Sequence, residues 1–250
     1  MGKMNGMQKE IVVSVAHLYK KFGNLPVLVD FNMELYREEN LVVLGRSGSG
    51  KSVLIKCIVG LIAPDHGIIK VLGQDINQLR EDELDQTRAR MGFLFQSNAL
   101  YDSMTIGENL RFPLKRHGRE MTEREFQRVV TEALADVGLE HTIDMMPSAL
   151  SGGMAKRIAL ARAMILKPEI MCYDEPTAGL DPVTALEIES LILTLKQKYR
   201  TSSILISHDM NCVRRTADRV VLLLDGKCYA QGSYSELKDS ADYKVKQFFQ

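Results

Sequence analysis

One stretch of eight residues constrains the fold of this 250-residue chain more than any other. Residues 45–52 read Gly-Arg-Ser-Gly-Ser-Gly-Lys-Ser and fit G-x-x-x-x-G-K-[ST], the pattern of a phosphate-binding loop. The apolar run at 41–44 predicts a buried strand before the loop, and apolar residues at helical spacing predict a helix over 53–61. This context favours a phosphate site over a glycine-rich turn without a ligand.

The residue types in this loop explain how it would hold a nucleotide. Glycines let consecutive backbone N–H groups point at one phosphate, and the following helix adds its positive amino end. Lys51 can reach the β- and γ-phosphates, and the Ser52 hydroxyl can ligate Mg²⁺. The predicted nucleotide-contacting residues of this loop are Gly45, Arg46, Ser47, Gly48, Ser49, Gly50, Lys51, Ser52 and Val53.

Two carboxylates follow a second apolar strand, predicted at 170–173. Ligands bind at the carboxyl ends of strands in sheets of this kind. Asp174 is therefore expected in the shell of Mg²⁺, and Glu175 is free to orient and polarise an attacking water. An isolated Asp-Glu pair would be a solvated turn, but the phosphate loop upstream favours the functional interpretation.

A third element, Leu-Ser-Gly-Gly-Met at 150–154, precedes an Ala-rich apolar helix. Ser151 is a good N-cap residue, and Gly152 and Gly153 expose backbone N–H groups at a helix amino end, which is a second anion site. A plain capped helix is the alternative interpretation. One nucleotide has one terminal phosphate, so either two ligands bind or one site completes that of another chain.

The remaining pattern alternates strands and helices around a helical insert. Thr122 and Glu125 form a capping box for a helix that continues to Val137 and ends near Gly138. A doubly wound α/β core is expected, with a helical insert between about 97 and 150. The other predicted elements are strands at 11–15, 27–33, 68–71, 91–95 and 203–206, a helix at 181–199 and a hairpin at 219–231.

Composition narrows the classes of partner. Lys and Arg together number 32, as do Asp and Glu, so nothing favours nucleic acid or a direct grip on anionic lipid. The first ten residues lack an apolar signal core, and Gly6 stands where myristoylation of Gly2 would need Ser or Thr. No apolar run approaches membrane-spanning length, so a role at a membrane would require a protein partner. The four cysteines lack C-x-x-C spacing and are expected to be buried free thiols.

Further positions complete a resemblance to the nucleotide-binding subunit of ABC transporters. The Leu-Ser-Gly-Gly run resembles the ABC signature, and Gln96 resembles the Q-loop glutamine. Asp181 resembles the D-loop aspartate, and His208 resembles the switch histidine. Phe22 lies where this family has its adenine-stacking aromatic. The resemblance covers nearly the whole chain.

Each of these residues also has an ordinary structural interpretation. Phe22 could be a core residue, with Tyr19 as the alternative stacking aromatic. Gln96 could simply cap a strand, and His208 could be a surface histidine. Asp181 could be only the N-cap of a helix, or it could serve as N-cap and D-loop residue at once.

The resemblance implies the ABC ATPase fold, which is a P-loop NTPase (RecA-like) α/β core with an antiparallel β subdomain and an inserted α-helical subdomain. Residues 1–250 would form a single ATP-binding domain, with the core at 1–96 and 160–250 and the helical signature subdomain at 97–159. Two copies would form a head-to-tail homodimer with two ATP molecules at the interface. That arrangement answers the question of two anion sites in one chain.

The resemblance also implies a role for each motif. Phe22 would stack on adenine. Residues implied to be catalytic are Lys51, Gln96, Glu175 and His208, and residues implied to surround Mg²⁺ are Ser52, Gln96 and Asp174. Residues implied to reach the partner chain are Ser151, Gly152 and Gly153, which contact its γ-phosphate, and Asp181, which couples the two sites.

One departure from the family pattern narrows the resemblance. Met154 replaces the signature glutamine, and residues 151–157 and 95–105 resemble the ATPase of Mla-type (Mce-linked) phospholipid transporters. This implies a multi-span permease and an Mce-type lipid-binding protein as partners. The chain would contact the membrane through the permease, as a peripheral subunit on the cytoplasmic face of the inner (plasma) membrane. An ABC transporter for another substrate is the alternative.

Two other classes of function fit the sequence less well. A soluble ABC protein of DNA repair or translation needs a long coiled-coil insert or two cassettes in one chain, and the sequence has neither. A nucleotide-gated binding module without turnover would have lost Glu175 or His208, and both are present. The sequence therefore predicts an ATPase that converts ATP and water to ADP and phosphate.

Overall fold

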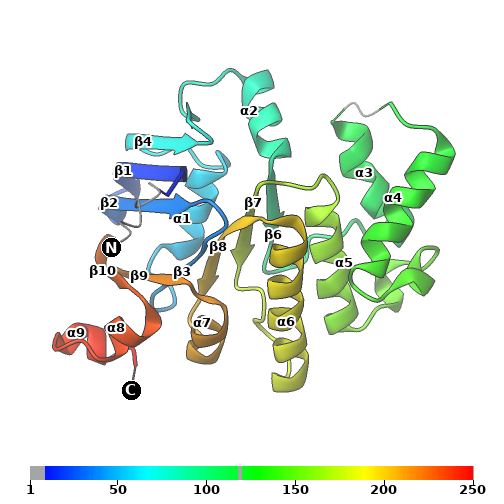
Figure 1. Cartoon of the computed structure of the whole chain (residues 1–250). Coiled ribbons are helices and arrows are strands. Elements are labelled where there is room, and N and C mark those ends of the chain that lie inside the picture. Colours follow the sequence, from blue (N-terminus) through cyan, green and yellow to red (C-terminus); the bar gives the residue numbers. More distant parts are fainter. Residues whose placement is uncertain (1–8, 118–119, 250) are drawn as a thin grey trace, which may run out of the picture.

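A computed structural model describes residues 9–117 and 120–249, so Gly2 and Gly6 lie outside the described residues. Figure 1 shows two sheets on one side of the molecule and a helical unit on the other. The helical unit is formed by α3 (Ile106–Arg116), α4 (Glu123–Ala135) and α5 (Gly152–Met164). The predicted helical insert is therefore confirmed.

The larger sheet has six strands in the order β10-β9-β3-β8-β7-β6. Its strands are β3 (Asn40–Leu44), β6 (Met91–Leu94), β7 (Ile170–Asp174), β8 (Ser202–Ser207), β9 (Arg219–Leu224) and β10 (Lys227–Gly232). β3 lies parallel to β8 and β9, and β7 lies parallel to β6 and β8. β10 returns antiparallel to β9 through Asp225 and Gly226, whose positive φ angles suit the predicted two-residue turn. Five parallel strands thus present their carboxyl ends at one edge.

The smaller sheet is antiparallel, in the order β2-β1-β4-β5. Its strands are β1 (Ile11–Phe22), β2 (Leu25–Tyr36), β4 (His66–Val71) and β5 (Gln74–Asp75). The predicted end of the first strand at Val15 was wrong, because register shifts after Val15 interrupt the alternation of apolar and polar residues while the pairing continues. This sheet is the antiparallel β subdomain that the resemblance implied.

The remaining helices are α1 (Lys51–Ile58), α2 (Glu81–Ala89), α6 (Pro182–Tyr199), α7 (Met210–Thr216), α8 (Tyr234–Lys238) and α9 (Tyr243–Lys246), with 3-10 turns at Glu140–Thr142 and Pro147–Ala149. The capping box of α4 is confirmed, since Thr122 Oγ1 accepts a hydrogen bond from the backbone of Glu125 at 3.3 Å. The predicted end near Gly138 was wrong, because α4 stops at Ala135. Val137 lies in the turn after the helix, and its side chain is buried in the core of the helical unit. Its apolar character therefore fits the helical spacing although it lies outside the helix.

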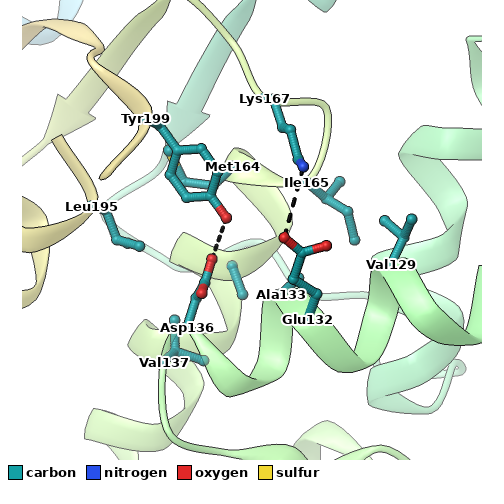
Figure 2. Close-up of a pocket in the computed structure, with 11 residues that line it drawn as sticks. Val129, Glu132, Ala133, Asp136, Val137, Met164, Ile165, Lys167, Leu195 and Tyr199 are labelled. Carbon is teal, nitrogen blue, oxygen red and sulfur yellow. Dashed lines mark hydrogen bonds and ion pairs between the residues drawn. The ribbon is translucent and has the colours of Figure 1, made fainter. Parts of the chain in front are cut away.

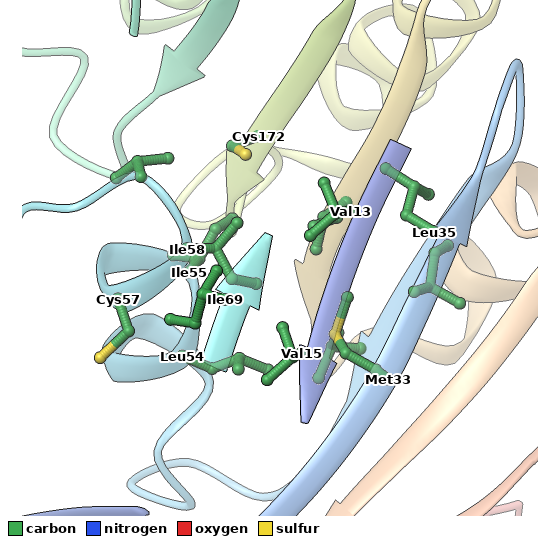
Figure 3. Packing of buried hydrophobic residues seen from close by; sticks show 14 of the residues in the cluster. Val13, Val15, Met33, Leu35, Leu54, Ile55, Cys57, Ile58, Ile69 and Cys172 are labelled. Carbon is green, nitrogen blue, oxygen red and sulfur yellow. The ribbon is translucent and has the colours of Figure 1, made fainter. Parts of the chain in front are cut away.

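The central sheet separates two apolar layers, because successive strand residues point to opposite faces. On one face Val43 and Cys172 pack with α1 and the smaller sheet, in the cluster that Figure 3 shows around Ile55 and Ile69. On the other face, the cluster around Tyr173 includes residues of α5, α6 and α7. The phosphate loop and the signature helix are thus attached to opposite faces of one sheet.

A small pocket marks the junction between the helical unit and the core (Figure 2). At the end of α6, the Tyr199 hydroxyl donates a hydrogen bond to the Asp136 carboxylate, which also accepts one from Lys198. On the other side of the pocket, Lys167 Nζ lies 3.7 Å from Glu132 Oε1. These contacts fasten α4 to the core.

Helix α5 belongs to both units. Ile158 and Ala161 pack in the helical unit, while Leu160 and Met164 pack in the core. The helix runs without a break across the predicted boundary between residues 159 and 160, and that boundary stays a prediction.

Two further expectations concern the rest of the chain. Within residues 9–117 and 120–249, no helix has both the length and the apolar character needed to cross a membrane. Cys57, Cys172 and Cys212 are buried as predicted, while Cys228 is half-buried. Near the carboxyl end, the Phe248 ring packs against the core and lies 5.7 Å from the guanidinium of Arg46 in the phosphate loop.

Candidate functional site

The phosphate loop joins β3 to α1 at the carboxyl edge of the central sheet. Gly50 has a φ of +101°, and a Cβ there would lie 2.7 Å from Val27 Cγ1, so backbone and packing both require glycine. At Gly45, a Cβ would lie 2.8 Å from the carbonyl oxygen of Leu223. These close contacts fix the loop around the amino end of α1, where an anion binds most favourably.

Lys51 is the buried cation of the loop. Its Nζ donates hydrogen bonds to the carbonyl oxygens of Gly45 at 3.0 Å and Arg46 at 3.1 Å. It also lies 3.6 Å from Glu175 Oε1, which follows β7. The lysine therefore connects the phosphate loop with the predicted water-activating carboxylate.

Glu175 lies between Lys51 and His208. Both carboxylate oxygens of Glu175 are 3.0 Å from His208 Nδ1. The side chain of Glu175 is 13% exposed and that of His208 is 62% exposed, so the carboxylate faces inward and the imidazole faces solvent. Glu175 has a φ of +50° and donates its backbone N–H to Ile206, so its backbone leaves the path of β7. A carboxylate placed in this way can orient a water and accept its proton.

Asp174 and Ser52 form an oxygen-rich pair beside the loop. Ser52 Oγ donates to Asp174 Oδ1 at 2.9 Å. Burial raises the pKa of Asp174, and the hydrogen bond from Ser52 opposes that shift.

These two hard oxygen donors fit Mg²⁺, which takes few protein ligands when phosphates and water supply the others. Among the residues that the structure describes, no group of three or more His, Cys, Asp or Glu residues could hold a metal alone.

Gln96 follows β6, whose pairing with β7 places the two strand ends side by side. Its backbone carbonyl accepts a hydrogen bond from Lys156 Nζ at 2.9 Å. Sequence reasoning missed Lys156, a 2% exposed residue of α5. A signal existed, because the residues three and four positions further along the helix, Ala159 and Leu160, are core residues.

The signature and the D-loop share a second groove, lined by Ser151, Gly152, Gly153 and Asp181 among others. Ser151 caps α5 as predicted, accepting from the backbone of Met154. Asp181 caps α6 and accepts two backbone hydrogen bonds, so its interpretation as an N-cap is confirmed. A Cβ at Gly153 would lie 2.7 Å from Thr184 Cγ2, so this glycine permits the close approach of α5 to α6.

Phe22 ends β1 with 50% of its surface exposed, so its interpretation as a core residue was wrong. It pairs with Leu25 across the hairpin, and Val27 two residues later packs beside Gly50. The end of the hairpin that carries Phe22 therefore lies next to the phosphate loop. Tyr19 is also exposed, at 38%, so the alternative stacking residue stays open.

The predicted site residues thus gather in two separate places in the structure. The phosphate loop, Asp174, Glu175 and His208 meet at one edge of the sheet, with Gln96 at the neighbouring strand end. The signature residues and Asp181 line their own groove. Figure 1 shows β6 and β7 between α1 and α5, the helices that carry the two glycine-rich motifs.

Comparison with known proteins gives a consistent result. A family model described as ABC transporter matches residues 28–178. The chain is 38% identical over 237 residues to the intermembrane phospholipid transport system ATP-binding protein MlaF of Haemophilus influenzae, covering 95% of this chain and 89% of that protein. It is 35% identical over 266 residues to the chloroplastic protein TRIGALACTOSYLDIACYLGLYCEROL 3 of Arabidopsis thaliana, covering 99% and 76%.

The solved structures include a dimeric post-hydrolysis state of the ATP-binding cassette MJ0796 bound to ADP and Pi. This chain matches it with a TM-score of 0.81 and 30% identity, covering 89% of this chain and 98% of that one.

Proposed function

We propose that this chain, which belongs to the ABC transporter family, is the ATP-hydrolysing subunit of a phospholipid transporter. The single observation that carries the hydrolytic part is the placement of the Glu175 carboxylate between Lys51 and His208. The lipid part is inferred from the extensive similarity to the Haemophilus influenzae protein, whose name states that role.

In the proposed reaction, water cleaves the γ-phosphate from ATP. Backbone N–H groups of the phosphate loop and Lys51 bind the phosphates, and Phe22 stacks on adenine. Glu175 orients the water and accepts its proton, and His208 holds Glu175 while contacting the γ-phosphate. Catalysis is then mainly positioning and charge stabilisation, as is general for phosphoryl transfer.

Ser52, Asp174 and Gln96 would hold Mg²⁺ beside the phosphates. The ion, when bound, neutralises charge on the β- and γ-oxygens. The buried carboxylate of Asp174 supports this assignment, because its charge is otherwise opposed by burial.

Two copies of the chain would complete each other's sites. Ser151, Gly152 and Gly153 of one chain would contact the γ-phosphate bound by its partner, and Asp181 would couple the two sites. The separation of the two glycine-rich motifs within one chain supports this arrangement, as does the similarity to a dimeric cassette.

The homodimer would work beneath a multi-span permease that contacts an Mce-type lipid-binding protein. The chain would then be a peripheral subunit at the cytoplasmic face of the inner membrane. Nucleic acid has no part in this proposal, because the chain has no basic surplus.

The hydrolytic proposal is tested by Glu175→Gln. The variant should hydrolyse ATP about 100-fold more slowly or worse, because the amide cannot accept a proton, and it should accumulate as an ATP-bound dimer. Turnover and particle mass in the presence of ATP and Mg²⁺ measure both effects. A variant that hydrolyses ATP at the parent rate would refute the role of Glu175.

The cargo is tested by purifying the intact membrane complex and identifying its bound lipid by mass spectrometry. Phospholipid, together with an Mce-type subunit, is the expected result. A complex that contains no phospholipid, and whose extra subunit is a receptor for an amino acid or a metal, would contradict the phospholipid cargo. The proposal that the chain hydrolyses ATP would not be affected.

A further inference from the structure

The segment from Phe95 to Tyr101, called the Q-loop below, has an unfavourable conformation. Asn98 and Ala99 have φ angles of +62° and +54°, in the left-handed region that costs free energy for residues other than glycine. Asn98 Oδ1 is buried and has no hydrogen-bond partner in the described part of the chain. A loop of this kind keeps its shape only when its surroundings impose it.

Two cations of the signature helix α5 hold this loop. Lys156 Nζ donates to the carbonyl oxygen of Gln96 at 2.9 Å and lies 3.5 Å from that of Phe95. Arg162 Nη2 donates to the carbonyl oxygen of Asn98 at 3.0 Å. One helix therefore grips the Q-loop at two points, one at each end of the residues Gln96 to Asn98.

Packing alone does not explain the lysine. Burial lowers the pKa of Lys156, and the negative charge of Asp174 opposes this effect only in part. A buried ammonium is costly to desolvate, and an apolar side chain of similar size often serves stability equally well or better. A methionine would fill the same space, but it could not hold a carbonyl oxygen.

The position of Lys156 along α5 gives it a function. The same helix begins at Ser151 and Gly152, which form the predicted contact with the partner's nucleotide, and Lys156 follows within its first two turns. The ammonium group of Lys156 is bonded to the carbonyl oxygen of Gln96, which lies beside Asp174 and Glu175 of the same chain.

We propose that Lys156 is a positioning residue that couples the signature to the Q-loop of the same chain. When Ser151 of this chain contacts the nucleotide bound by the partner chain, Lys156 then sets the position of Gln96 in this chain. The proposal rests on the proposed function, because it takes the roles of Ser151 and Gln96 from there.

The experiment uses the full chain with Glu175→Gln, so that ATP and Mg²⁺ hold the dimer without turnover. Amide hydrogen exchange is followed at residues 151–157 and 95–101, with and without ATP. Both segments should become protected when Lys156 is present. With Lys156→Met, protection should persist at 151–157, while exchange at 95–101 should be at least about tenfold faster than in the parent.

Two further variants separate coupling from general damage. Lys156→Arg keeps a charged donor and should restore protection of the Q-loop. Lys196→Met removes a lysine of α6 that is 17% exposed and bonded to Asp218, away from the Q-loop, and it should leave both segments as in the parent. ATP affinity, measured separately without Mg²⁺, should be the same in all variants.

Each other outcome has a defined meaning. Equal protection of the Q-loop with methionine and with lysine at position 156 would overturn the coupling proposal. Absence of ATP-dependent protection at 151–157 in the parent would instead contradict the proposed dimer. If the methionine variant does not fold, Lys156→Gln takes its place. Its shorter amide donor should leave exchange at 95–101 faster than in the parent while 151–157 stays protected, and Q-loop protection equal to the parent would refute the coupling.

Discussion

At the scale of single residues, Asp174 shows a conflict between stability and function. Its carboxylate is buried with one hydroxyl donor, and burial raises its pKa above the ordinary value of 3.8. In the absence of nucleotide and metal, the charge therefore destabilises the fold, although the proposed chemistry needs it.

Asp174→Asn should consequently stabilise the metal-free protein and impair its reaction. The amide oxygen can still accept from Ser52, and the buried charge is gone. Stability should rise by about 1 kcal/mol, and Mg²⁺-dependent hydrolysis should fall about 10- to 100-fold. Denaturant unfolding with a chelator present and steady-state turnover measure the two effects. A variant that is both less stable and fully active would contradict this account.

The same residue predicts a dependence on pH. Because its folded-state pKa is raised, Asp174 binds its proton more tightly when folded, so its ionisation lowers stability as pH rises through that raised pKa. The stability advantage of Asp174→Asn should be complete at neutral pH, should shrink as pH falls through the raised pKa, and should vanish below 3.8. Unfolding curves of both proteins across acidic pH test the sign. An advantage that grows toward acid would show that ionised Asp174 is stabilised by the fold.

Phe22 is the residue proposed to stack on adenine. Its exposed ring at the end of the hairpin next to the phosphate loop favours contact with a base. Phe22→Ala should weaken ATP binding about tenfold, the size of one base–aromatic stack, and change the rate at saturation little. Tyr19→Ala is the comparison, since Tyr19 is the other exposed aromatic of β1. A larger loss from Tyr19→Ala would transfer the stacking role.

At the scale of helices and strands, the sequence correctly predicted the elements in which the pattern of apolar residues is uninterrupted. The strands β3, β7 and β8 and the β9–β10 hairpin have continuous apolar runs or a clear turn, and they lie where predicted. The first strand was predicted too short because its bulges break the alternation that identifies strands. The end of α4 was predicted too late because Val137 is buried outside the helix.

The junction in Figure 2 supplies a prediction for the helical unit. Tyr199→Phe removes the hydroxyl that donates to Asp136 and leaves the ring in place. Stability should fall by about 1 kcal/mol, or about 2–4 °C in melting temperature for a chain of this length. Tyr243→Phe, at a 71% exposed tyrosine, is the matched control and should melt like the parent. Equal melting of both variants would show that the Asp136 contact contributes little.

At the scale of the whole molecule, motifs identified the site residues because each motif is contiguous in sequence. Contacts between motifs were beyond sequence reasoning, because they depend on the packing of segments far apart in the chain. The approach of Lys51 to Glu175 and the grip of Lys156 on Gln96 are of this kind. The separation of the signature groove from the phosphate loop likewise required the fold.

That separation leads to a prediction about two chains rather than one. Lys51→Ala removes the buried cation of the phosphate loop, and Ser151→Arg places a bulky side chain in the signature groove. In a head-to-tail dimer of either variant alone, neither of the two ATP sites is complete. A mixed dimer regains one, because the intact phosphate loop of the Ser151→Arg chain faces the intact signature of the Lys51→Ala chain. In the Glu175→Gln background, ATP should therefore produce dimers in the mixture but in neither variant alone, as measured by sedimentation. ATP-induced dimers of a single variant, or a mixture that stays monomeric where the parent dimerises, would mean that the signature of one chain does not complete the site of the other.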